Sequence, residues 1–261
     1  MSRSIVFFGS TKLSEEILVF LIKKGITIKA ILSIPKEFKI SYSEKKVNNS
    51  NYADLSKYAE QLNIPYYEVE STEEKRITNY VQVLKELSPD VILALGWYYM
   101  VPKTIREIPV EGVWGIHASL LPNYAGGAPL VWAIINGETQ TGVTLFRMDS
   151  GVDDGDIIYQ RKLSIDKKDT IKTMIKKSAV ASKAIILKSL LADKIKYKPQ
   201  DKSKIIIYPQ RSPKDGEIDW SWDSEKIENF VRAQTKPYPG AWTMIDNKKV
   251  IFWDISIKNQ K

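Results

Sequence analysis

Two side chains in loops that follow predicted strands, His117 and Asp153, are of the types that perform acid–base chemistry. His117 is the only histidine of the chain, so any imidazole chemistry near neutral pH must take place there. It follows the predicted strand 112–116, and the sharp exit over 118–122 would leave its side chain at the ligand-binding edge of a parallel sheet. A lone histidine is more often structural than catalytic, so a base role requires an orienting partner.

Asp153 is the candidate partner of His117. It lies in the acidic turn 151–156, directly after the predicted strand 141–148, so the two loops can converge at one edge of the sheet. A buried carboxylate beside an imidazole fixes its tautomer and stabilises its protonated form. The turn is also typical of ordinary Asp-Gly turn chemistry, whereas calcium ligation is disfavoured because the run lacks the spaced acidic ligands and closing glutamate of an EF-hand loop.

A glycine pair, Gly126-Gly127, precedes a predicted helix over 130–136, with Pro129 well placed as its first residue. Free amides at this helix start are suited to an anion or a developing oxyanion. A pair this short is a weak phosphate signal, and the chain has neither a Walker nor a dinucleotide glycine pattern. A nucleotide triphosphatase is therefore not predicted.

The first half of the chain alternates short apolar runs with amphipathic stretches. The runs are 4–8, 27–33 and 91–95, and the amphipathic stretches are 13–24 and 73–87. This order predicts an α/β fold with a Rossmann-like, mainly parallel sheet and helices on both faces. The turn Gly9-Ser10-Thr11 then lies at the carboxyl end of the first strand, where open α/β sheets bind ligands. The polar stretch 35–50 is expected to be a long loop, either a lid or a plain surface loop.

The second half of the chain contains one long predicted helix and then a change of character. The helix covers 170–191, with Asp169 as N-cap and an apolar stripe that packs on the core. After Pro199 the pattern consists of a short β run at 205–208, a helix at 224–234 and two strand-like runs at 242–245 and 250–255. We therefore predict a catalytic domain over 1–200 and a small mixed carboxy-terminal domain over 201–261.

Composition excludes several classes of protein. The chain has no cysteine, so disulfides, thiolate zinc sites and cysteine nucleophiles are absent, and no metal is expected. The chain has 43% hydrophobic and 27% charged residues, no apolar stretch of membrane-spanning length and no signal peptide. We therefore expect a cytoplasmic protein with no membrane partner. The net charge of +8 comes from lysines scattered along the chain, so a nucleic-acid partner is not expected.

Several strings across the chain are characteristic of one protein family. They are GWYYMVP at 96–102, GIHASLLP at 115–122, WAI at 132–134, GE at 137–138, TGVT at 141–144, VDDGDI at 152–157, RSPKDGEIDW at 211–220, RA at 232–233 and PYPGA at 237–241. With them the chain resembles the 10-formyltetrahydrofolate-dependent formyltransferase family over nearly its whole length. The resemblance implies a Rossmann-like catalytic domain that transfers a formyl group from the folate co-substrate to an amine, without a metal.

The resemblance also implies the positions of the site. It places His117, as general base, and Asp153, which orients it, at the reacting carbon, where an amine attacks and a tetrahedral oxyanion forms. It places the folate against Trp97, Tyr98, Met100, Val101, Asp149 and Val152. The candidate substrate contacts, which border the expected acceptor cavity, are Gly9, Ser10, Thr11, Asn123 and Tyr124.

One position departs from the family pattern. The family usually carries asparagine two residues before the histidine, whereas this chain has Gly115, which has no side chain to donate that hydrogen bond. Loss of one such donor typically lowers the rate about a hundredfold to a thousandfold. Three outcomes stay open: a slow enzyme, an enzyme in which water or a backbone amide takes over, and an inactive variant.

The acceptor is expected to be the amine of a nucleotide-linked amino sugar, as used in polysaccharide biosynthesis. The chain resembles amino-sugar formyltransferases in its length and in the stretch 96–99, whereas relatives that formylate initiator methionyl-tRNA carry a full carboxy-terminal barrel and this chain stops at Lys261. Trp97, Tyr98 and Tyr124 are suited to stacking on a base or sugar, and equally to folate packing or core filling.

Three alternatives to an amino-sugar formyltransferase remain at this point. They are a methionyl-tRNA formyltransferase, a hydrolase that releases formate from the same folate, and a non-catalytic folate-binding module. The small carboxy-terminal part either forms a homodimer interface or caps the substrate cleft, and the sequence does not separate these two roles.

Overall fold

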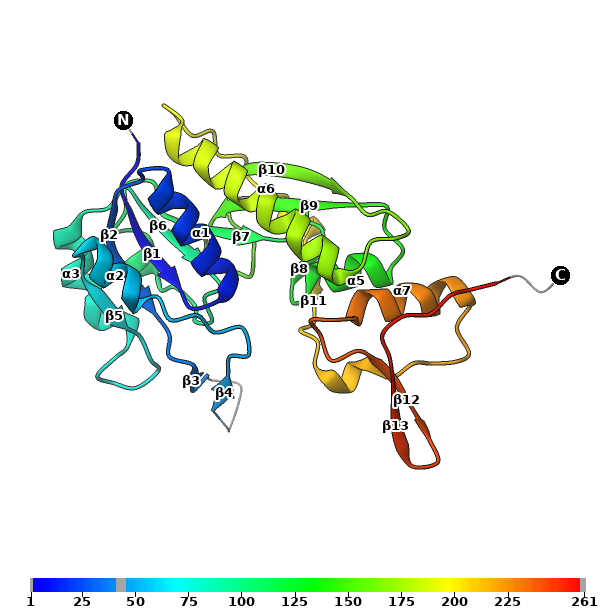
Figure 1. The fold of residues 1–261 in the computed structure, drawn as a ribbon. Coiled ribbons are helices and arrows are strands. Elements are labelled where there is room, and N and C mark those ends of the chain that lie inside the picture. Colours follow the sequence, from blue (N-terminus) through cyan, green and yellow to red (C-terminus); the bar gives the residue numbers. More distant parts are fainter. Residues whose placement is uncertain (1, 41–45, 259–261) are drawn as a thin grey trace.

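The computed structural model describes residues 2–40 and 46–258 and is built around a seven-stranded sheet (Figure 1). Across the sheet the strands are β10 (Ile157–Ser164), β9 (Gln140–Arg147), β7 (Val113–His117), β6 (Val91–Leu95), β1 (Ile5–Gly9), β2 (Ile28–Ser33) and β5 (Tyr66–Glu68). Strands β7 through β5 pair in parallel, and β9 and β10 are antiparallel to their neighbours. The predicted α/β fold with a mainly parallel sheet is confirmed.

The order of the strands reverses at β1. From β1 the chain moves to β2 and β5 on one side, and then returns to β6 and β7 on the other side. The carboxyl ends of β1 and β6 lie at the same level, because Gly9 is in register with Leu95. This is the topological switch point at which open α/β sheets bind their ligands.

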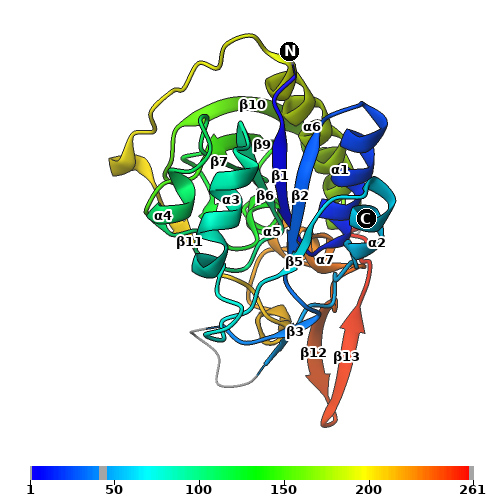
Figure 2. The same ribbon diagram turned by 90° about the vertical axis from the view of Figure 1, so that its left-hand side faces the viewer.

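Both faces of the sheet are covered, because successive residues of a strand point to opposite sides. In β1, Ile5 and Phe7 join the cluster that contains residues of α1 (Lys12–Lys23), α2 (Ser56–Leu62) and α6 (Ile171–Leu191). Val6 and Phe8 join the opposite cluster, with α3 (Val81–Leu87) and α4 (Lys103–Arg106). Figures 1 and 2 show the two helical layers on the two sides of the sheet. Burial on both faces explains the unbroken apolar run of this strand.

The ends of the two long helices follow from local capping chemistry. Thr11 caps α1 through a reciprocal capping box with Ser14, and Gly25, at φ +71°, follows its end. In α6 the predicted N-cap, Asp169, is wrong by one residue, because Thr170 forms the capping box with Thr173. The Asp169 carboxylate instead accepts hydrogen bonds from the Asp166 amide and the Thr173 hydroxyl.

The carboxy-terminal part shares a core with the amino-terminal part. Helix α7 (Ser224–Gln234) packs on α5 (Pro129–Ile135), and their apolar residues form one cluster with Ile171 and Met174 of α6. The hairpin of β12 (Ala241–Ile245) and β13 (Lys248–Phe252) projects from this layer (Figure 1). The predicted helix and both strand-like runs of this part are therefore present.

Several short elements were not predicted. The 35–50 stretch contains β3 (Glu37–Phe38) and β4 (Val47–Asn48), and its residues 41–45 lie outside the described residues, so its role as a lid stays a prediction. In the predicted amphipathic stretch 73–87, the helix begins only with the 3₁₀ turn η1 (Ile77–Tyr80). Two further unpredicted elements, β8 (Ala125–Gly126) and η3 (Pro213–Gly216), connect to the site region, whereas β11 (Ile207–Tyr208) lies within the predicted β run at 205–208.

None of the helices in residues 2–40 and 46–258 is both long enough and apolar enough to span a membrane.

Candidate active site

The structure brings His117 and Asp153 together at the carboxyl end of β7. His117 is the last residue of this strand, and its side chain is 9% exposed. Its Nδ1 lies 3.4 Å from Oδ2 of Asp153, which is in the loop after β9. The Gly126 amide donates to the same carboxylate oxygen at 2.8 Å. The loops after β7 and β9 thus converge as the sequence pattern implied, because the two strands are direct neighbours.

The second ring nitrogen of His117 also faces an oxygen. Its Nε2 lies 2.6 Å from the carbonyl oxygen of Tyr124. A carbonyl and a carboxylate both accept hydrogen bonds, so only the doubly protonated ring can donate to both partners. The neutral ring that acts as a base must therefore release one of the two contacts.

The amides of the glycine pair are occupied. Besides the bond from Gly126 to Asp153, the Gly127 amide donates to the carbonyl of Tyr208 at 2.8 Å. The expectation of free amides at this helix start is wrong for both glycines, because β11 and the Asp153 loop approach from the two sides. Gly126 has φ +89°, and a Cβ there would lie 2.5 Å from the Tyr208 carbonyl oxygen, so the position requires glycine.

The space above Gly115 is filled by a neighbouring side chain. Residues 115 and 117 lie on the same face of β7, because side chains alternate along a strand. A Cβ built on Gly115 would lie 2.7 Å from Cε of Met148 and 3.1 Å from the ring of Phe146. The apolar end of Met148 thus occupies the place of a side chain at position 115.

The candidate folate segment after β6 forms an aromatic cluster. The ring of Trp97 lies 4.8 Å from that of Phe8, and its Nε1 is buried with no hydrogen-bond partner among the described residues. The ring of Tyr98 lies 4.9 Å from that of Phe38. Burial raises the pKa of Tyr99 to about 12.

The two apolar candidates of the same segment differ in exposure. Met100 is 66% exposed, whereas Val101 is buried in the cluster that supports β1 and β6. An exposed apolar side chain such as Met100 is suited to covering a planar ligand, whereas Val101 belongs to the core.

The candidate substrate residues after β1 link this strand to β6 and to residues 46–51. Ser10 is buried, and its hydroxyl donates to the Gly96 carbonyl at 3.3 Å. The Ser10 carbonyl accepts from Nδ2 of Asn49 at 3.1 Å, and Oδ1 of Asn49 accepts from the Tyr98 hydroxyl at 3.1 Å. Thr11 is the N-cap of α1. A Cβ on Gly9 would lie 2.7 Å from Cβ of Ser14, so Gly9 permits the close packing of α1 on β1.

The other two substrate candidates follow His117 in sequence. The ring of Tyr124 is stacked on Tyr208 with 4.7 Å between centroids, and its hydroxyl donates to Glu138 at 2.7 Å. The Asn123 carbonyl accepts a hydrogen bond from the Ser119 hydroxyl at 2.6 Å. One face of the Tyr124 ring is therefore already covered by the protein.

Asp149 and Val152 lie in the same loop as Asp153. Asp149 pairs with Arg106 at 3.8 Å and with Lys202 at 3.3 Å. The backbone amide of Ser150 and then the Lys202 ammonium lower the pKa of the Asp149 carboxyl. Val152 is 44% exposed, as an apolar ligand contact would have to be.

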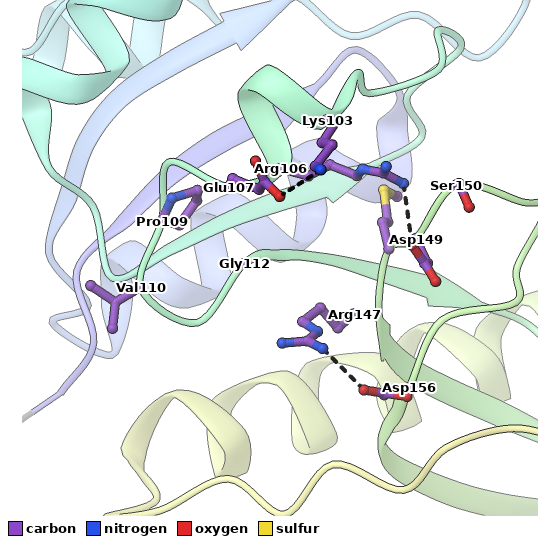
Figure 3. A pocket seen from close by; sticks show the side chains of 11 residues that line it. Lys103, Arg106, Glu107, Pro109, Val110, Gly112, Arg147, Asp149, Ser150 and Asp156 are labelled. Carbon is purple, nitrogen blue, oxygen red and sulfur yellow. Dashed lines mark hydrogen bonds and ion pairs between the residues drawn. The ribbon is translucent and has the colours of Figure 1, made fainter.

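A cavity of about 580 Å³ opens beside the Arg106–Asp149 pair (Figure 3). Its charged lining is paired within itself, because Lys103 lies 3.6 Å from Glu107 and Arg147 lies 3.1 Å from Asp156. Neither His117 nor Asp153 lines it. The cavity therefore adjoins the candidate folate segment without containing the candidate reacting centre.

Sequence reasoning missed two residues that organise the site, Asn49 and Gln200. Asn49 lies in the polar stretch 35–50, and Gln200 lies at the predicted domain boundary. Neither position carries a periodic or motif signal, since both act through contacts with distant parts of the chain.

No group of three or more histidine, cysteine, aspartate or glutamate side chains in the described part of the chain is arranged to hold a metal ion.

The chain belongs to the formyltransferase family, which matches it over residues 2–190, and the C-terminal domain of formyl transferase matches residues 211–261. The methionyl-tRNA formyltransferase of Thermodesulfovibrio yellowstonii is 34% identical over 96% of this chain and 79% of the relative. The bifunctional polymyxin resistance protein ArnA of Wigglesworthia glossinidia brevipalpis is 40% identical over 70% of this chain and 29% of its own length.

Solved structures show the same fold. The N-formyltransferase from Helicobacter canadensis in complex with folinic acid and dTDP-3-aminofucose superposes with a TM-score of 0.69, at 20% identity, over 96% of this chain and 87% of the other. The chain is thus a formyl-transferring enzyme, and the expected co-substrate, 10-formyltetrahydrofolate, is that of its family.

Proposed function

We propose that this enzyme formylates the amine of a nucleotide-linked amino sugar, with His117 as general base oriented by Asp153. The contact between His117 Nδ1 and the Asp153 carboxylate carries the proposal. In the neutral ring, a proton held at Nδ1 faces this carboxylate, and the lone pair at Nε2 is then free for the proton of the attacking amine.

The carbonyl of Tyr124 marks where the amine would bind. It lies 2.6 Å from Nε2, which is the distance of a hydrogen-bond partner, so a substrate amine at that position is within reach of proton transfer. The protonated ring that results is stabilised by the negative charge of Asp153. Residues 124–126 have to shift slightly for this exchange, since they contact both members of the pair.

The residues after β6 fit a folate. When bound, 10-formyltetrahydrofolate supplies the formyl carbon. The indole N–H of Trp97, which has no partner in the part of the chain that the structure describes, is a donor that suits the polar edge of a pterin ring. The exposed side chains of Met100 and Val152 offer apolar cover. We assign Trp97, Tyr98, Met100, Val101, Asp149 and Val152 to this binding segment.

Charge supports a small acceptor over a nucleic acid. Residues 211–261 contain nine Lys and Arg against eight Asp and Glu, so the part that matches the C-terminal domain is almost neutral. Binding of a nucleic acid requires many lysine and arginine contacts to phosphates. The neighbour crystallised with dTDP-3-aminofucose shares this fold, and we assign Gly9, Ser10, Thr11, Asn123 and Tyr124 to the acceptor side.

A second candidate acceptor is initiator methionyl-tRNA. The observation that favours it is the 34% identity to a methionyl-tRNA formyltransferase over 96% of this chain. The identity spans both parts of the chain, whereas the match to ArnA covers 70% of it.

The test uses purified protein, 10-formyltetrahydrofolate, a panel of nucleotide-linked amino sugars and methionyl-tRNA. Release of tetrahydrofolate and the mass of each acceptor are measured, with His117→Ala as control. A formylated amino sugar that is absent in the control supports the proposal. Formylated tRNA moves the assignment to the second candidate, and formate released without an acceptor indicates a hydrolase.

A further inference from the structure

Gln200 contacts the backbone of the loop that carries Asp153. Its Nε2 donates to the carbonyl oxygens of Asp153 and Gly155, both at 2.7 Å. Gln200 lies between residues 190 and 211, in the stretch covered by neither of the two formyl transferase regions. A residue between the two regions thus reaches back to the candidate reacting centre.

The orientation of the Gln200 amide follows from its partners. Both are carbonyl oxygens, which only accept, so the NH₂ group must face them. Oε1 is then buried with no hydrogen-bond partner in residues 2–40 and 46–258. An unpaired buried acceptor is unfavourable, so the two carbonyl contacts hold the side chain in this orientation.

The residues on either side of Gln200 fasten the same loop. The backbone of Lys198 forms two hydrogen bonds with that of Ile157, at 2.8 and 2.9 Å. The Lys202 ammonium lies 3.3 Å from Asp149 and 2.9 Å from Asp154. Lys202 is 59% exposed in both ion pairs, which therefore contribute little. The part-buried hydrogen bonds of Gln200 are the contacts that reach the backbone of Asp153 itself.

Asp153 needs such a contact because of its backbone conformation. Its φ is +52°, in the left-handed region that residues other than glycine rarely adopt. Such conformations persist where the surroundings hold them. At Gly155 the loop is also tightly packed, since a Cβ there would overlap the Arg147 carbonyl. Gln200 therefore ties together the strained residue and the tightest point of the loop.

We propose that Gln200 is a positioning residue, which holds Asp153 in its left-handed conformation so that the carboxylate faces His117. The importance of this for catalysis rests on the proposed function, but the positioning itself does not. A loop held only by Gly126 and the flanking pairs would let the carboxylate move away from the ring.

The experiment compares Gln200→Met, which keeps the length of the side chain and removes the N–H donors, with Lys202→Met as the matched control in the same segment. Because the chain has one histidine, the imidazole ¹⁵N signals of protein without a histidine tag report on His117 directly. These signals are recorded at one fixed pH, with Asp153→Asn as the reference for a lost carboxylate. The kcat and the KM for the folate are measured on the accepted amine.

The expected result is that Gln200→Met moves the imidazole signals toward those of Asp153→Asn and lowers kcat about tenfold to a hundredfold, with KM for the folate little changed. Lys202→Met should leave the imidazole signals as in the wild type. Wild-type signals in Gln200→Met would overturn the proposal, whether or not an acceptor is known. If Gln200→Met does not fold, Gln200→Asn, which is one methylene shorter, should show a smaller shift in the same direction, and wild-type signals in it count against the proposal.

Discussion

Replacing Asp153 with asparagine removes the charge beside His117 and changes little else. Asparagine tolerates the left-handed conformation that Asp153 adopts at φ +52°. Its side-chain oxygen can still accept the Gly126 amide bond of 2.8 Å. The variant therefore isolates the electrostatic effect of the carboxylate on the protonated ring.

The expected loss follows from the 3.4 Å between Nδ1 and Oδ2. At this distance a pair of unit charges interacts by about 5 kcal/mol at an effective dielectric constant near 20, and by roughly 1 kcal/mol in water. His117 is 9% and Asp153 20% exposed, so the first figure is closer. Because each 1.4 kcal/mol is a factor of about ten, kcat should fall by about a hundredfold to a few thousandfold.

The assay is the initial rate of formyl transfer at saturating folate and acceptor, followed by tetrahydrofolate release. Asp154→Asn is the control, because its carboxylate pairs with Lys202 at 2.9 Å and accepts the Gly151 amide. Thermal unfolding of each variant shows whether the fold is kept. A rate for Asp153→Asn within twofold of wild type, or an equal loss in Asp154→Asn, would refute the reasoning.

Three further predictions concern single positions. Met148→Ala clears the space 2.7 Å from a Cβ at position 115, so Gly115→Asn is made together with it. The double variant should have a kcat up to about a hundredfold higher than that of Met148→Ala alone. An unchanged rate would mean that no donor is missing. Gly126→Ala, at φ +89° and 2.5 Å from the Tyr208 carbonyl, should lower the free energy of unfolding by about 1–3 kcal/mol in urea titrations, and wild-type stability would contradict the steric argument. Burial raises the pKa of Asp169, but hydrogen bonds from Lys177, the Asp166 amide and Thr173 outweigh it, so the pKa is lowered. Asp169→Asn should therefore lower the free energy of unfolding by about 1–3 kcal/mol near pH 7. The difference in unfolding free energy between wild type and variant should have its full size above the pKa of the unfolded state, at about pH 4, and shrink as the pH falls below it. A difference that stays constant between pH 7 and 2 would exclude the carboxylate as its source.

Local patterns in the sequence predicted most of the elements. The strand 91–95 and the helix 224–234 have the predicted bounds, and α1 begins within one residue of its predicted start. These elements follow from hydrophobic periodicity and from capping residues, which act over a few positions. Strand β10 was not predicted, because at the sheet edge it is half-exposed and lacks a continuous apolar run.

The residue types of the candidate reacting centre were also visible in the sequence. A single histidine and an acidic turn, each after a strand, limited the choice to His117 and Asp153. The family strings extended that choice to the folate and acceptor sides, whose individual roles remain predictions.

Only the tertiary structure decided how these groups are held. The contacts of His117 with Tyr124 and of Gln200 with the Asp153 loop join positions with no shared periodicity, and Gln200 lies 47 residues from Asp153 in sequence. Tertiary packing also decided that the amides of Gly126 and Gly127 are occupied and that the methyl group of Met148 lies against Gly115. Hydrophobic patterns specify which face of an element is buried, whereas hydrogen-bond partners across loops depend on where the packed elements bring the backbone.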